Sequence, residues 1–343
     1  MRAAFLKIIL SAAGVFIIYF LVSLFVLSPI SAEYWVPEMV VVKKYLIKEI
    51  KSPKIVFIGG SNVLYNIDAA RVEKELNISC FNFGLHAGMP LKWLLDFSID
   101  SINPGDTVVM ALEQAYYQAG QKWGTWRFRN AVAWKHEALD QLGLKDKLHA
   151  LLDGGTIDLF LEIISTKFAH MCSNPSSPEI KKRLIAFEHP ERIIKIFNEG
   201  ELSGTAFPFW QPIDRHGTVM QSDQSKYNGK FVDVTSPNSL DPEIQMLLSD
   251  FLLTMKRRGV RVYFANSPYG IDHPPEAGWS QSEVQFQKEI SCLGSEVIER
   301  RADLFFPRKM FFNTPLHMTR EGKEARTRVI IQALKQKNVG KAP

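Results

Sequence analysis

Three short apolar segments, separated by stretches with helical patterns, constrain the fold of this chain more than any other feature. They occupy residues 54–59, 78–83 and 106–112, and residues 68–76 and 90–102 between them have helical patterns. Strands that are apolar without interruption, rather than at alternate positions, are buried on both faces. Such strands alternating with helices are typical of a parallel sheet covered by helices on both sides. The sequence therefore predicts an α/β fold with a mainly parallel sheet in a three-layer α/β/α arrangement.

The alternation of strands and helices lapses in the middle of the chain and then returns. Residues from about 115 to 241 mix helical and loop patterns and are rich in aromatic residues, Gly, Pro and Ser. The alternation resumes with predicted helices at 242–258, 280–293 and 319–335 and predicted strands at 261–266 and 296–299. We interpret residues 54–343 as one domain that carries a long helical and loop insertion at about 115–241.

The N-terminal segment has the composition of a membrane-spanning helix. Arg2 and Lys7 are followed by residues 8–32, which contain no charged side chain. A helix needs about 20 apolar residues to span a bilayer, whereas the apolar core of a cleaved signal has about 7–15. We therefore predict a transmembrane signal-anchor within residues 1–32, with cleavage near 30–32 left open, and a juxtamembrane linker at 33–53. The short basic flank places the N-terminus inside.

Composition excludes several other classes of function. The net charge of +5 is small and spread along the chain, so nucleic acid is not an expected partner. Cys80, Cys172 and Cys292 form no C-x-x-C pair, and no two histidines have the H-x-x-x-H spacing of a metal site. The glycine-rich loops of nucleotide-binding proteins are missing as well. The sequence predicts neither a metal nor a cofactor.

The carboxyl ends of the predicted strands are the place to look for a functional site, because ligands bind at this edge of open parallel sheets. The segments that follow the strands are 60–62, 84–88, 113–114 and 266–268, and a polar segment near the C-terminus spans 313–317. They bring a serine, two histidines, a glutamate and several amide side chains to one edge: Ser61, Asn62, His86, Glu113, Asn266, Asn313 and His317.

Ser61 is the candidate nucleophile at this edge. It follows Gly59 and Gly60, which allow a sharp turn and the close approach of a substrate. The alternative without a catalytic role is a turn that only ends a strand. The Gly-Ser-Asn tripeptide alone favours that alternative by about two to one. The segment is not the Gly-x-Ser-x-Gly elbow of α/β-hydrolases, because Val63 occupies the place of the last glycine.

Further segments, taken with the strand–Gly–Gly–Ser–Asn block, resemble a known superfamily. Residues 57–62, Asn82-Phe83-Gly84 and Asn313-x-x-x-His317 with the following Thr319 and Gly322 resemble the blocks of the SGNH (GDSL-like) hydrolases. Residues 57–62 and 84–88 look most like a membrane-anchored bacterial branch of that superfamily that is associated with cell-surface polysaccharides. The resemblance covers about 54–113 and 250–335, and it implies a flavodoxin-like order of strands.

The resemblance also implies a role for each matched residue. Ser61 would attack an ester, and His317 would take the serine proton and deliver it to the leaving group. Asn313 stands where the family has the acid that orients the histidine. The backbone N–H groups of Ser61 and Gly84 would hold the oxyanion of the tetrahedral intermediate.

Asn313 departs from the family pattern. The usual acid is an aspartate separated from the histidine by two residues, whereas three residues separate Asn313 from His317. An asparagine carbonyl can accept the Nδ1 proton of histidine, but it supplies no negative charge to stabilise an imidazolium. Glu113 and Asp272 are two carboxylates that could replace the acid, and the sequence does not rank them.

A second departure concerns the oxyanion donor. The family commonly has Gly-x-Asn-Asp after the third strand, with the asparagine as a donor, and this chain has residues 112–117 there. Asn62, Gln114 or Asn266 could replace that donor, or no side chain does so. His86 either contributes to the site or only bonds to loop carbonyls, and the sequence favours neither interpretation.

The function implied by the resemblance is ester hydrolysis or acyl transfer, with acetyl as the expected acyl group. The expected substrate is an extracytoplasmic polysaccharide or another envelope glycan, and a membrane acyltransferase is a candidate partner. The expected location is the bacterial cytoplasmic membrane, with a single span and the catalytic domain in the periplasm. The alternative is a catalytically weak or inactive protein that binds glycan or scaffolds a polysaccharide export or modification complex.

An aromatic and basic stretch at residues 123–129, together with Trp134, fits more than one role. Aromatic faces stack on sugar rings and arginines pair with acidic sugars, so a glycan contact has a weight of about one in four. Packing within the insertion is the commoner fate of aromatic side chains, and the membrane interface is a third alternative.

Overall fold

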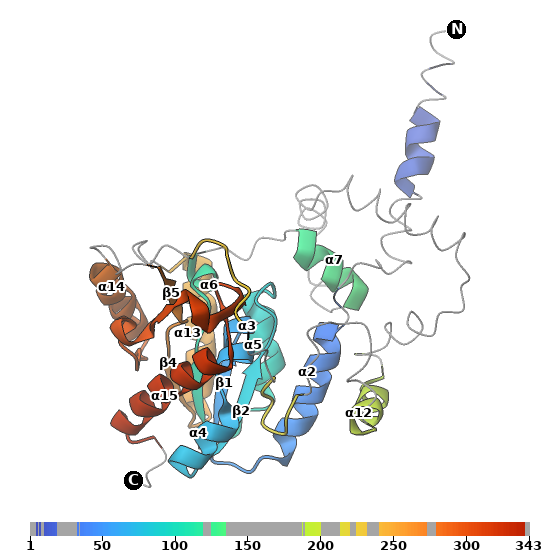
Figure 1. Ribbon diagram of the computed structural model, residues 1–343. Helices are drawn as coiled ribbons and strands as arrows, with labels where there is room; N and C mark the ends of the chain where they lie inside the picture. The colour runs from blue at the N-terminus through green and yellow to red at the C-terminus, as the bar shows by residue number, and fades with distance from the viewer. Residues whose placement is uncertain are drawn as a thin grey trace. The chain divides into compact units, whose positions relative to one another are not determined.

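The computed structural model (Figure 1) describes most of the predicted α/β domain. The described residues are 10–18, 35–118, 125–134, 189–199, 213–219, 224–231, 240–272 and 279–339, with the single residues 5, 7, 33 and 187. The chain divides into two compact units, Met1–Glu38 with Lys122–Ile193, and Met39–Gln121 with Ile194–Pro343. The second unit contains the whole sheet.

A parallel sheet forms the centre of the larger unit. Its strands are β1 (Lys54–Gly59), β2 (Ser79–Gly84), β3 (Thr107–Met110) and β4 (Arg261–Phe264), in the order β2-β1-β3-β4. All three pairings are parallel, as predicted. Beyond β4, Phe264 forms an isolated parallel bridge with Val297, inside the strand predicted at 296–299. The order of the strands is that of flavodoxin-like sheets.

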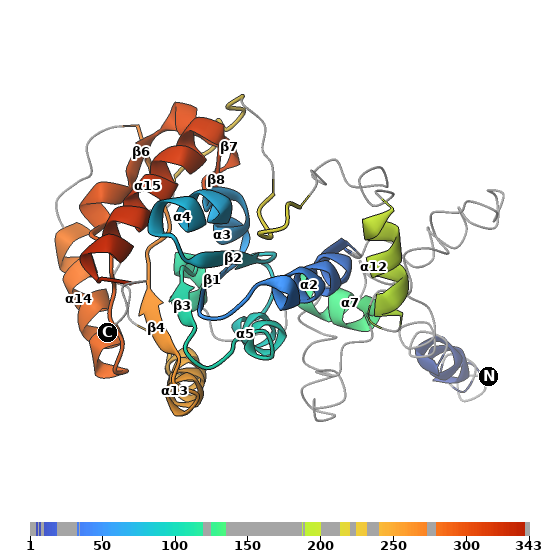
Figure 2. The same ribbon diagram turned by 90° about the horizontal axis from the view of Figure 1, so that it is seen from below.

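Helices cover both faces of this sheet, and Figure 2 shows them on its two sides. On one side lie α3 (Ser61–Asn66), α4 (Ala69–Leu76) and α15 (Arg320–Gln336), and on the other lie α5 (Leu91–Ile99) and α13 (Pro242–Arg257). Side-chain caps fix where two of these helices begin: Asp68 accepts from the backbone N–H of Arg71, and Asp241 accepts from that of Glu243. The prediction of an α/β fold is confirmed.

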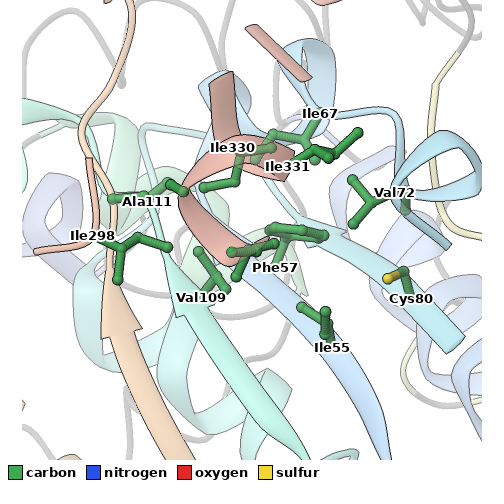
Figure 3. Close-up of a cluster of buried hydrophobic side chains, with 14 of the residues drawn as sticks. Ile55, Phe57, Ile67, Val72, Cys80, Val109, Ala111, Ile298, Ile330 and Ile331 are labelled. Atoms are coloured by element: carbon green, nitrogen blue, oxygen red, sulfur yellow. The ribbon is translucent and has the colours of Figure 1, made fainter. Parts of the chain in front are cut away.

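The core between the sheet and α15 explains why the strands are apolar on the face toward this helix. Phe57 of β1 and Val109 of β3 are fully buried, and they pack with Val63 of α3 and with Ile330 and Ile331 of α15. Figure 3 shows the two isoleucines above these strands. The contact fixes the start of α3, and with it Ser61, against the end of β1.

Short elements complete the described structure. They include two small sheets, β5 (Tyr269–Ile271) parallel to β6 (Phe305–Pro307) and β7 (Phe311–Thr314) antiparallel to β8 (His317–Met318). The other helices are α2 (Trp35–Leu46), α6 (Gln114–Gln118), α7 (Thr125–Trp134), α12 (Pro190–Asn198) and α14 (Trp279–Cys292). Three 3₁₀ turns lie at Ile47–Glu49, Arg301–Leu304 and Arg308–Met310.

Backbone groups at the outer edge of β2 are covered, which fixes the loop after Gly84. The N–H of Asn82 donates to the carbonyl of His216, 2.8 Å away. The buried Lys43 ammonium donates to the carbonyls of Asn82 and Gly84, at 2.8 and 2.7 Å. Burial holds the pKa of Lys43 well below its usual value, with the charge of Asp214 acting in the opposite direction. An edge closed in this way is protected from pairing with another chain.

In the smaller unit, part of the aromatic stretch is described. The Trp126 and Trp134 rings of α7 meet edge to face with centroids 5.9 Å apart. The Trp126 indole N–H donates to the Glu33 carboxylate, 2.8 Å away. These two tryptophans therefore pack together, whereas Trp123 lies outside the described residues.

Two other predictions fall largely on residues that are not described. Residues 19–32 of the predicted transmembrane segment and residues 135–186 of the predicted insertion are among them. Along the described part of the chain, we find no helix with the length and apolar character that crossing a bilayer requires. The membrane anchor and the insertion stay predictions.

Candidate active site

The nucleophile position is built by two glycines at the end of β1. Gly59 ends the strand, Gly60 precedes the helix, and α3 begins at Ser61. A Cβ atom on Gly59 would lie 2.4 Å from the Ala111 carbonyl oxygen. A Cβ atom on Gly60 would lie 2.6 Å from both Glu113 carboxylate oxygens. Only glycine allows this turn to approach the end of β3 so closely, so the turn that presents Ser61 depends on both.

Asn313 and His317 meet across the β7–β8 hairpin. The Nδ1 atom of His317 lies 2.9 Å from the Asn313 amide oxygen. Because that oxygen can only accept, Nδ1 carries the proton and Nε2 is left as an acceptor. The pairing expected from the sequence is therefore present, despite the extra residue in the spacing.

Helix α3, which begins at Ser61, contacts the segment that carries the histidine. The Asn66 side chain donates to the Leu316 carbonyl at 2.7 Å and accepts from the Met318 N–H at 2.9 Å, so it brackets His317 on both sides. The Tyr65 ring lies 4.3 Å from the His317 ring, centroid to centroid. Ser61 is one turn before Tyr65 on the same face of α3. The helix therefore brings Ser61 and His317 to one side.

The electrostatic environment keeps His317 neutral. Burial and, to a lesser extent, the charge of nearby His86 lower its pKa to about 3. Asn313 adds no negative charge that would raise it. His317 is therefore an unprotonated base throughout the neutral range, and its charged form is disfavoured.

His86 is close enough to affect the pKa of His317. Its ring Nδ1 accepts from the Gly88 N–H at 3.0 Å, which is a backbone N–H of its own loop rather than a loop carbonyl.

Glu113 lies against the serine turn. Its carboxylate accepts from the backbone N–H groups of Gly60 at 3.2 Å and Asn62 at 2.9 Å, and it also interacts with the Ser61 hydroxyl. Burial raises its pKa to about 7, and the hydrogen bonds counteract this only in part. Neither carboxylate suggested by the sequence replaces Asn313 at His317 Nδ1, because Glu113 binds the turn and Asp272 pairs with Arg308.

Two of the predicted oxyanion donors are already engaged in hydrogen bonds within the protein. The Gly84 N–H donates to the Asn82 side chain at 2.9 Å. The Asn62 side-chain amide donates to the Ala111 carbonyl at 3.0 Å and to the Ser267 hydroxyl at 2.8 Å. Gly84 instead has a packing role, because a Cβ atom there would lie 2.2 Å from the Leu64 nitrogen.

Two other donors are not engaged within the described part of the chain. The Asn266 side-chain nitrogen is buried without a hydrogen-bond partner, while its backbone is bound by Glu299 and Arg326. The Ser61 N–H donates to no described acceptor. These two groups fit the role of oxyanion donors better than Gly84 and Asn62.

A cavity of about 220 Å³ is bordered by Glu113, which binds the serine turn, whereas Ser61 and His317 are not among the residues that line it. Its lining combines polar side chains after β3 with a mainly apolar wall from two loops: Glu113, Gln114, Ala115, Gln118, Ser267, Pro268, Tyr269, Gly270, Pro315 and Leu316. The volume is below the 300–1,000 Å³ of pockets for drug-sized ligands. It suits a short acyl group or a single sugar ring. Gln114, suggested as an oxyanion donor, lines this cavity.

The sequence offered little indication of the residues that support the site. Asn82, buried in β2, donates to the Val63 carbonyl within α3 and to the Ile67 carbonyl just after it. The sequence placed Asn82 in a family block and Ser267 in the segment 266–268, but it assigned neither a role, and Tyr65 and Asn66 gave no signal. Among the described residues, no group of three or more His, Cys, Asp and Glu side chains is arranged to hold a metal ion.

Comparison with known proteins identifies no family for this chain. No protein-family model matches the chain, and no curated protein matches it. The hypothesis of a serine active site therefore depends on the arrangement of Ser61, His317, Asn313 and Glu113.

Proposed function

We propose that this chain is a serine ester hydrolase or O-acyltransferase of the SGNH type. The observation that carries the proposal is the His317–Asn313 contact of 2.9 Å, which leaves Nε2 as an acceptor, and the His317 ring lies against Tyr65 of the helix that begins at Ser61. The position at the carboxyl end of a parallel sheet, beside a small cavity, also supports it.

The proposed reaction has two halves. Ser61 Oγ attacks the ester carbonyl carbon while its proton passes to His317 Nε2, and the Ser61 N–H and Asn266 amide stabilise the oxyanion. The bond to the leaving oxygen then breaks, that oxygen takes the proton from His317, and Ser61 is left acylated. Water or a sugar hydroxyl next gives its proton to His317 and accepts the acyl group, and His317 returns the proton to Ser61 Oγ as the acyl-enzyme bond breaks. The choice between them decides between hydrolase and transferase.

Acetyl esters of an extracytoplasmic polysaccharide or envelope glycan are the proposed substrates. The cavity has room for an acetyl group, and its amide side chains suit sugar hydroxyls. The charge-free N-terminal segment supports a protein anchored in the bacterial cytoplasmic membrane, with its catalytic domain in the periplasm. A membrane acyltransferase is the proposed partner for the transfer reaction.

The orienting residue gives the first prediction. Asn313→Asp is expected to raise the pKa of His317, because a carboxylate stabilises the imidazolium, and to speed the reaction of Ser61 with a fluorophosphonate by about tenfold or more. Asn313→Ala removes the acceptor for the Nδ1 proton and is expected to slow it. Equal second-order labelling rates for Ala, Asn and Asp at this position would show that residue 313 does not act on His317.

Ester turnover tests the proposed function. The full-length protein in mild detergent is expected to hydrolyse nitrophenyl acetate and to lose this activity in Ser61→Ala. Circular dichroism and thermal unfolding serve as the control that both proteins are folded. Equal rates of ester hydrolysis for the two folded proteins would contradict the proposal that the chain is an esterase. The alternative, an inactive protein that binds glycan, would then be favoured, because Asn313 pairs with His317 but lacks the negative charge of an aspartate.

A further inference from the structure

Glu113 is a buried carboxylate that no cation neutralises within the described residues. Glu113 is 3% exposed, and its carboxylate forms no ion pair with any described Lys, Arg or His. Burying a charge without a partner is costly unless hydrogen bonds compensate. Here they come from the N–H groups of Gly60 and Asn62, one on each side of Ser61.

The serine turn is built around this carboxylate. The missing side chain of Gly60 makes room for both carboxylate oxygens, which would lie 2.6 Å from a Cβ atom there. The Asn62 side chain ties the same turn to the Ala111 carbonyl and to Ser267. Glu113 also lines the cavity of about 220 Å³, so it borders the space where a substrate would bind.

We propose that Glu113 is the positioning residue that holds Ser61 in its reactive orientation, and that protonation of Glu113 makes the serine less reactive. The inference deepens the proposed function and rests on Ser61 being the nucleophile. An ionised carboxylate accepts from both N–H groups and, before the reaction, from the hydroxyl, whose proton passes to His317 Nε2 when Ser61 attacks. A protonated one carries a hydrogen on one oxygen, so it can no longer satisfy all three donors.

The change of charge falls in the neutral range. Burial raises the pKa of Glu113 to about 7, well above an ordinary glutamate, against hydrogen bonds from Asn62, Gly60 and Ser61. The serine is thus expected to be reactive above pH 7 and to lose reactivity below it. His317 does not titrate there, because its pKa is about 3.

The other titratable groups around Glu113 stay neutral in this range. Tyr117 of α6 is buried, and burial and then the charges of Tyr269 and Glu113 raise its pKa well above the usual value. Tyr269, which lines the same cavity, also has a raised pKa because of burial. Ser61 and Ser267, on the remaining sides, carry no charge. Of these groups, Glu113 is therefore the one that is expected to change charge near pH 7.

The test is the rate of Ser61 labelling by a small alkyl fluorophosphonate between pH 5 and 9, with the full-length protein. For the wild type, the second-order rate constant is expected to rise about tenfold per pH unit below pH 7 and to level off above it. Glu113→Gln is expected to be about 10- to 100-fold slower at pH 8 and to show no such rise. Glu113→Asp should keep a pH-dependent rate at a lower plateau, since it retains the charge.

Glu75→Gln is the matched control, because Glu75 is an exposed glutamate of α4 paired with Lys335. It should follow the wild-type profile. If the wild type is labelled and Glu113→Gln shows the same pH profile of labelling, this inference is overturned, while Ser61 remains the nucleophile. A folded wild type that is not labelled at any pH would overturn both this inference and the proposed function.

Discussion

Replacing His317 with alanine is expected to lower the rate at which Ser61 reacts with a fluorophosphonate by about 10³-fold. The side chain supplies the one acceptor that the proposal assigns to the serine proton, and Asn313 fixes its tautomer from 2.9 Å. Without it, the serine hydroxyl reacts at nearly its intrinsic rate. Labelling kinetics at pH 8, where Glu113 is ionised, measure the loss directly.

His86→Ala is the control for this experiment. His86 lies near His317 and lowers its pKa, but its own ring is bound to the Gly88 N–H. Its removal should change the labelling rate by less than about tenfold and should favour a higher pKa for His317. A His317→Ala protein that stays within tenfold of the wild type would contradict the assignment of His317 as the base.

Replacing Arg326 with leucine is expected to destabilise the protein by about 3–5 kcal/mol. Arg326 and Glu299 form an ion pair in which the side chains are 1% and 0% exposed. The guanidinium also donates to the Asn266 carbonyl at 3.0 Å, while Glu299 accepts from the Asn266 N–H at 3.1 Å. Burial already raises the pKa of Glu299, and Arg326 is the main group that opposes this shift. Without Arg326, an uncompensated carboxylate is left in the core.

Urea unfolding at pH 7 measures this loss. Adding Glu299→Gln to Arg326→Leu removes the unpaired charge, so the double variant should recover part of the lost stability. A loss below about 1 kcal/mol in the single variant would show that the pair does not hold the loop after β4. The same loop carries Asn266, so the stability of this pair bears on the proposed oxyanion site.

The central strands could be predicted from the sequence because burial on both faces makes them continuously apolar. The predicted segments 54–59 and 78–83 differ from β1 and β2 by at most one residue. The small sheets formed by β5 to β8 could not be predicted, because strands of two to four residues show no periodicity.

The candidate site divides in the same way. The pairing of Asn313 with His317 could be predicted, because both belong to one short segment. The sequence could not show that the Gly84 N–H and the Asn62 side chain are engaged, because side-chain hydrogen bonds decide whether their donors are available. Glu113 was one of two unranked candidates to replace the acid beside the histidine, and it binds the turn around the serine. No pattern within one segment carries that information.

The most direct test of Ser61 as an activated nucleophile is to find where a fluorophosphonate attaches to the full-length protein. Attack by Oγ forms an oxygen–phosphorus bond and releases fluoride, so the adduct is stable and can be mapped by peptide mass spectrometry. The proposal predicts one adduct per chain, on Ser61, and none in a folded Ser61→Ala protein. An unlabelled wild type, or an adduct on another residue such as Ser267 that persists in Ser61→Ala, would contradict it.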